Sequence, residues 1–128
     1  MPDIQLKNSQ SMVAPSGHYS HAVCSGGFVF ISGLLPLTPQ GSKVEAFDDQ
    51  VKLIFKNMET ILSECDSDKN HLVQVRVYLK DIDHWPRFNQ LYAEWLGDHR
   101  PARCVVPVPT LHGGVDIEIE AMARQKNH

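Results

Sequence analysis

The residues with the most evident capacity for chemistry are an arginine and a row of acids near the end of the sequence. Arg103 lies in an otherwise apolar stretch, and Asp116, Glu118 and Glu120 alternate with apolar residues over 115–121. A guanidinium offers a planar fork to a small carboxylate, and a carboxylate close by can orient or deprotonate a water molecule. Such a pair would suit hydrolysis or hydration of a small carboxylic acid. The plainer alternative for the acids is a solvated sheet face.

The alternation over residues 115–121 predicts a strand whose apolar side chains face the interior and whose three acids share the opposite face. A row of like charges is stabilised by a cation nearby. Arg103 belongs to the preceding predicted strand, over residues 102–108, so we expect it beside the acids. Cys104, the next residue along, is then expected to point toward the core as an inert buried thiol.

The elements that must position these residues follow from the hydrophobic pattern. Residues 1–16 are polar and predict an extended lead-in, and the apolar runs at 21–24 and 28–31 flank a Ser-Gly-Gly turn, which predicts a hairpin. Apolar residues recur every three or four positions over 47–65, as in an amphipathic helix. Residues 72–79 alternate and are rich in β-branched side chains, as in a strand.

A second helix is expected after this strand, with Asp81 or Asp83 as its cap, Pro86 in its first turn and Gly97 at its end. Two final strands complete the order strand, strand, helix, strand, helix, strand, strand. That order predicts an α+β sandwich in which two helices cover one face of a mixed sheet. The other face needs water or a partner chain to cover it.

The composition is that of an ordinary globular protein, with 42% hydrophobic and 21% charged residues among 128, and we expect one domain over residues 1–128. A net charge of −3 without a basic run argues against nucleic acid as a partner. The sequence lacks a signal-peptide pattern and any run near the roughly 20 apolar residues of a membrane span. Three scattered cysteines predict a reducing, cytoplasmic setting, and the scattered histidines predict no metal site.

Six short segments, in order along nearly the whole chain, carry a more specific signal. They are residues 17–23 (GHYSHAV), 31–33 (ISG), 77–81 (VYLKD), 88–92 (FNQLY), 101–103 (PAR) and 117–121 (IEIEA). Together they resemble the Rid (YjgF/YER057c/UK114) family of enamine/imine deaminases, and the ending PARCVVPVPTLHGG is closer to a sister subgroup than to the archetypal RidA proteins. The resemblance implies a chorismate-mutase-like fold and a homotrimer whose open sheet faces meet as a central barrel. It also implies a site in each cleft between subunits.

The resemblance further implies roles for individual residues in the hydrolysis of 2-imino acids to 2-keto acids and ammonia. Arg103 would clamp the substrate carboxylate, and Glu118, rather than Glu120, would support the attacking water. The other implied pocket residues are Tyr19, Ser32, Gly33 through its backbone N–H, Asn89, and Val105 through its backbone. The implied reaction uses neither a metal nor an organic cofactor.

Three positions depart from the common family pattern. Leu34 stands where many members have glutamine, His18 where many have proline, and Val105 where a cysteine is common. The first two bear on the substrate range more than on the reaction. His18 and His21 flank Tyr19 and could be polar groups of the pocket or ordinary loop residues.

Two other classes of function compete with the deaminase. A trimer that binds 2-keto acids without catalysis, or acts as a chaperone or regulatory partner, could use the Arg103 clamp equally well. Glu118 discriminates between these alternatives, because a pure anion binder gains nothing from an acid that faces its ligand. RNA cleavage, linked to some relatives, is disfavoured by the net charge.

Overall fold

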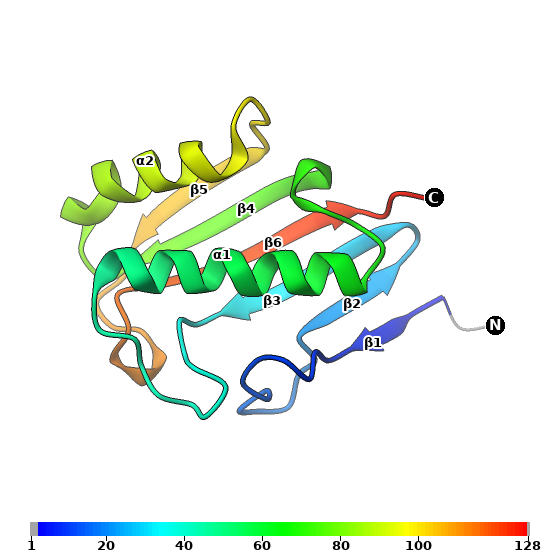
Figure 1. Ribbon diagram of the computed structural model, residues 1–128, viewed down its shortest axis with the longest axis horizontal. Helices are drawn as coiled ribbons and strands as arrows, with labels where there is room; N and C mark the ends of the chain where they lie inside the picture. The colour runs from blue at the N-terminus through cyan, green and yellow to red at the C-terminus, as the bar shows by residue number, and fades with distance from the viewer. Residues whose placement is uncertain (1–2, 128) are drawn as a thin grey trace.

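The computed structural model describes residues 3–127 and contains a mixed sheet with two helices packed on one of its faces (Figure 1). The elements are β1 (Gln5–Lys7), β2 (Ala22–Ser25), β3 (Phe28–Leu34), α1 (Phe47–Glu64), β4 (Leu72–Leu79), α2 (Trp85–Leu96), β5 (Ala102–Pro107) and β6 (Ile117–Arg124). Three short 3-10 turns join them: η1 (Lys69–His71), η2 (Ile82–His84) and η3 (His112–Gly114). The α+β class and the two helices on one face, predicted from the sequence, are confirmed.

The sheet has the strand order β1-β2-β3-β6-β4-β5, with β4 and β5 parallel and the other neighbouring pairs antiparallel. The parallel pair requires a crossover, which α2 supplies, and this places β5 at the edge of the sheet. The last strand, β6, inserts between β3 and β4 near the centre. The expectation that Arg103 lies on a strand next to the acids is therefore wrong, because β4 separates β5 from β6.

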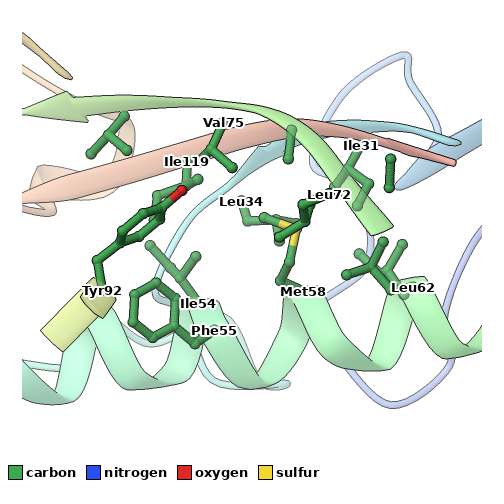
Figure 2. Close-up of a cluster of buried hydrophobic side chains, with 14 of the residues drawn as sticks. Ile31, Leu34, Ile54, Phe55, Met58, Leu62, Leu72, Val75, Tyr92 and Ile119 are labelled. Carbon is green, nitrogen blue, oxygen red and sulfur yellow. The ribbon is translucent and has the colours of Figure 1, made fainter. Parts of the chain in front are cut away.

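The core lies between the helices and the sheet. Helix α1 buries Val51, Ile54, Phe55, Met58, Ile61 and Leu62, the spacing predicted from its sequence. Figure 2 shows several of these side chains directed at Val75 of β4 and Ile119 of β6. The alternation of β6 is also confirmed, because Ile117, Ile119 and Ala121 are buried under the helices while Glu118 and Glu120 face the other way. Asp116 precedes β6, and its carboxylate accepts a hydrogen bond from Gln50 of α1 at 3.2 Å, so the expectation that all three acids share one face is wrong.

The start of α2 differs from the prediction. Asp81 caps the η2 turn, where its carboxylate accepts a hydrogen bond from the Asp83 N–H at 2.9 Å, and α2 begins only at Trp85, without a side-chain cap. Pro86 does lie in the first turn, where its missing N–H costs little. Gly97 ends the helix with a φ of 64°, a conformation that favours glycine.

The lead-in over residues 1–16 contains a strand that the sequence did not predict. Strand β1 pairs with β2 at the sheet edge, with Gln5 opposite Cys24. Residues 1 and 2 lie outside the described residues. A strand of three residues is too short to display an alternating pattern, which explains why it was missed.

The face of the sheet opposite the helices is not covered by any element of residues 3–127 (Figure 1). Large apolar side chains are exposed on it, namely Leu6, Phe28, Phe30 and Val106. We call this surface the open face. Within the same described range, no helix is long and apolar enough to cross a membrane.

Candidate active site in two halves

The first half of the candidate site is a hollow beside β3 and β6. It has a volume of about 340 Å³ and is lined by Ser16, Tyr19, Ser32, Gly33, Leu35, His112 and Glu118. A β-bulge shapes it, because the register of β3 on β6 shifts between Ile31 and Leu34. The structure thus brings together Tyr19, Ser32, Gly33 and Glu118 from the set predicted by sequence.

The bulge lets Gly33 approach the Glu118 side chain closely. A methyl group placed on Gly33 would overlap the Glu118 carboxylate, so any larger residue here would displace that side chain. The neighbouring Ser32 is held in two ways: its N–H donates to the His21 carbonyl at 3.0 Å, and its hydroxyl donates to the Ser20 carbonyl at 2.7 Å. The backbone at the floor of the hollow is therefore fixed.

The two acids of β6 that face away from the helices differ in their partners. Glu120 accepts a hydrogen bond from the Tyr78 hydroxyl and lies 4.0 Å from the Arg76 guanidinium. The same hydrogen bond is the main cause that raises the pKa of Tyr78 to about 12. Glu118 makes no hydrogen bond or ion pair with any residue between 3 and 127. Glu120 is thus engaged, while Glu118 is available to a water or a ligand.

The surroundings of Glu118 favour its protonated form. Burial is the largest cause that raises the pKa of its carboxyl, and the charge of Glu120 raises it further, while His112 acts in the opposite direction. A carboxyl with a raised pKa is better matched to proton exchange near neutral pH than an ordinary glutamate.

The second half of the candidate site surrounds Arg103 at the edge of the sheet. The Arg103 Nη1 donates to Asn89 Oδ1 at 3.0 Å, and its guanidinium carbon lies 4.9 Å from the centre of the Tyr92 ring. The same guanidinium carbon lies 5.8 Å from the ring centre of Trp85 and 5.8 Å from that of Phe88, both on α2. Asn89 and the aromatic face of α2 therefore fix the direction of the guanidinium.

Tyr92 has an unusual polar group beneath this arginine. Its hydroxyl is buried without a hydrogen-bond partner among the described residues, and it points toward the sheet (Figure 2). Burial raises the pKa of Tyr92 to about 12, so the phenol stays neutral beside the cation. Val105, two residues along the same strand, is half-buried against the core.

The two halves lie on opposite faces of the sheet within one chain. Arg103 is paired with Val75, which is buried under the helices, whereas Glu118 is paired with Tyr78 and faces away from them. The fold thus brings Arg103 and Asn89 together, but it does not bring them to the Glu118 hollow.

Cys104 and the two early histidines also have defined positions. Cys104 is exposed and points away from the helices, so its predicted burial is wrong: Arg103 takes the helix side of β5, and alternation turns the thiol outward. His21 is buried in hydrogen bonds to the lead-in, and His18 is exposed. Among residues 3–127, no group of three His, Cys, Asp or Glu side chains could hold a metal ion.

His112 is the ionisable residue of the hollow that the sequence reasoning missed, and Ser16 and Leu35 were missed with it. It lies on η3, in a His-Gly-Gly turn that precedes the acidic strand. Two consecutive glycines between the last two strands are typical of a turn, and a histidine directly before such a turn, close in sequence to Glu118, was the available signal. Only the fold shows that His112 lines the same hollow as Ser32 and Gly33 of β3.

Comparison with known proteins places this chain and its fold in a class. A family model described as "Endoribonuclease L-PSP" matches residues 9–125. Protein HMF1 of Saccharomyces cerevisiae is 35% identical over 92% of this chain and 92% of its own length. Reactive Intermediate Deaminase A, chloroplastic, of Arabidopsis thaliana is 31% identical over 93% of this chain and 65% of its own. The crystal structure of yeast Mmf1 superposes with a TM-score of 0.92 at 31% identity, covering 96% of this chain and 99% of that one.

The fold, the matched model and these relatives define a small α+β protein of the L-PSP class. The chain belongs to the Rid family, as its six motifs predicted. Family members are named variously, from endoribonuclease to deaminase, so membership alone does not define the reaction.

Proposed function

We propose that this protein hydrolyses 2-imino acids and their enamine tautomers to 2-keto acids and ammonia. The observation that carries the proposal is the pair of half-sites: an oriented guanidinium at the sheet edge and a half-buried, unpaired carboxylate in a hollow. The Arabidopsis relative named as a reactive intermediate deaminase supports the same reaction.

We further propose that the protein is a homotrimer in which Arg103 of one copy meets the Glu118 hollow of the next. Two features support this assembly. The open face carries exposed apolar residues with no covering element among those described, and such faces are usually buried against a partner. The two half-sites also lie on opposite faces, so a second copy is needed to complete one site.

In the proposed reaction, Arg103 forms a bidentate pair with the substrate carboxylate and fixes the imine carbon beside a water molecule. Glu118 accepts a proton from this water as its oxygen bonds to the carbon, and it returns that proton to the imine nitrogen to give a neutral carbinolamine. Glu118 then takes the hydroxyl proton of the carbinolamine and delivers it to the amino nitrogen as the carbon–nitrogen bond breaks, so that ammonia and the keto acid are released. General acid–base help of this kind contributes roughly 10²–10⁴-fold.

The proposed chemistry needs no metal or organic cofactor, because the imine carbon is already electrophilic. We propose the cytoplasm as the site of action. Relatives carry names that include chloroplastic and mitochondrial proteins, so location varies within the family.

The test is a competition assay with the purified protein. An amino-acid oxidase generates 2-imino acids in situ, semicarbazide traps them, and the protein competes for the imine. We expect the wild type to suppress semicarbazone formation and Arg103→Ala to lose this effect, because the carboxylate clamp is gone. Arg103→Lys should be nearly as poor, since an ammonium cannot form the planar fork.

Glu118→Gln and Glu120→Gln form a matched pair in the same assay. We expect Glu118→Gln to lower kcat by at least about 100-fold with a modest change in KM, and Glu120→Gln to have a much smaller effect. If only Glu120→Gln were defective, Glu120 rather than Glu118 would be the catalytic acid, and the assignment made above would be wrong. If the wild type binds 2-keto acids but leaves the semicarbazone unchanged with aliphatic, aromatic and basic substrates, the non-catalytic alternative is correct.

A further inference from the structure

Glu118 lacks a fixed partner for its charge, although other cations lie near β6. Arg76 is committed to Glu120, and Arg103 of the same chain lies on the other face. Lys43 bonds to Glu45 at 3.3 Å and to the Gly114 carbonyl at 3.4 Å. His112 is the side chain lining the hollow that can become positively charged.

The position of His112 is built into the fold. Gly113 and Gly114 follow it with φ values of 75° and 70°, so the backbone reverses in a way that favours glycine at both places. The Gly114 N–H donates to the Leu111 carbonyl at 3.1 Å, and the Lys43 ammonium donates to the Gly114 carbonyl. The first bond closes the turn that carries His112, and the second anchors its C-terminal end.

We propose that His112 is a positioning residue that acts through Glu118, as an imidazolium that faces the Glu118 carboxylate across the hollow. This inference rests on the proposed function, in which Glu118 must be ionised to accept a proton from water. Burial and Glu120 both oppose ionisation of Glu118, and His112 favours it. The histidine thus extends the working range of the base toward lower pH.

The other groups that face this pair are unchanged when His112 is replaced. Tyr19 and Ser32 line the same hollow, and Glu120 lies beside Glu118 on β6. In the proposed trimer, Arg103 of a second copy also faces the hollow. A comparison of His112 variants therefore isolates the contribution of the imidazole.

The test compares wild type, His112→Gln and His112→Lys, with His71→Gln as the control. His71 pairs with Asp68 away from the hollow, so its loss removes another imidazole–carboxylate contact without touching Glu118. The first readout is the pH profile of kcat. The second is the titration of the Glu118 carboxyl carbon by ¹³C NMR, with its signal assigned from Glu118→Gln.

We expect His112→Gln to raise the pKa of Glu118, because the cation that favours the carboxylate is lost. At a given acidic pH less Glu118 is ionised, so kcat falls by roughly three- to tenfold near pH 6. The profiles converge at higher pH, where Glu118 is ionised in both proteins. His112→Lys keeps a cation at this position, so we expect it to restore the wild-type kcat at acidic pH. We expect the pH profile of His71→Gln to match that of the wild type.

Identical Glu118 titrations in wild type and His112→Gln would overturn the inference, whatever the activity. So would a fall in kcat that is uniform across pH and not rescued by His112→Lys, since that pattern indicates a merely structural role. If the wild type shows no deaminase activity, the proposed function fails. The NMR titration still decides whether His112 controls the charge of Glu118.

Discussion

At the residue scale, the contact between Gly33 and Glu118 explains why a glycine follows the serine of the Ser-Gly motif. The bulge in β3 turns this part of the strand toward β6, and the carboxylate occupies the space that a Cβ would need. The backbone angle of Gly33 is not in the left-handed region, so the requirement is for space alone. The motif therefore encodes the position of the acid.

We predict that Gly33→Ala displaces the Glu118 carboxylate from the hollow and lowers kcat at least about tenfold, at a cost of about 1–3 kcal/mol in stability. Steady-state kinetics and denaturant unfolding measure the two effects. Gly17→Ala is the stability control, because a methyl group there meets only the Tyr19 ring at an ordinary 3.7 Å. Wild-type kcat in Gly33→Ala would show that the observed carboxylate position is unimportant for turnover.

At the element scale, one buried imidazole holds the lead-in, which is followed directly by the segment that carries Tyr19. The His21 Nδ1 accepts from the Ser9 N–H at 2.9 Å, so its proton is on Nε2, which donates to the Val13 carbonyl at 2.9 Å. The Asn8 side chain accepts from the His21 N–H at 2.9 Å. Between β1 and Tyr19 the chain has no regular structure, so these three bonds do much to order it.

We predict that His21→Ala loosens this segment locally. The Ser9 N–H is left buried without a partner, at a cost of about 1–3 kcal/mol. Hydrogen exchange should therefore speed up over residues 5–16 while α1 and β4 keep their protection. His18→Ala, an exposed neighbour, should leave the pattern unchanged. Equal exchange in the two variants would show that the packing of Met12, rather than the imidazole, anchors the lead-in.

Local patterns in the sequence predicted most of these elements, and non-local features account for the errors. The period of α1 and the alternation of β4 and β6 were sufficient because each depends on residues close in sequence. The insertion of β6 between β3 and β4 depends on pairing over long separations, so Arg103 was expected beside the acids and Cys104 in the core. His112 was missed for the same reason, since its contact with the hollow exists only after the chain folds.

At the scale of the whole molecule, the fold leaves two things incomplete in a single chain. The open face exposes Phe30 and its apolar neighbours, and the guanidinium and the carboxylate of the site lie on opposite faces. In the proposed homotrimer, one symmetric contact would cover the open face and would also bring the guanidinium of one copy to the carboxylate of the next. The proposal can be tested through function, because shared sites behave differently from sites within one chain.

We predict that two inactive variants restore activity when they assemble together. In a mixed trimer of Arg103→Ala and Glu118→Gln chains, a site is intact when its arginine comes from the Glu118→Gln chain and its glutamate from the Arg103→Ala chain. Random assembly of equal amounts gives this arrangement in about one quarter of the sites, the product of two chances of one half. The variants are unfolded together and refolded, and the semicarbazide assay measures the recovered fraction. Separately refolded variants, mixed afterwards without exchange, are the control. If co-refolded mixtures whose mixed assembly is verified by native mass spectrometry stay as inactive as this control, each site lies within one chain, and the proposed shared site is wrong.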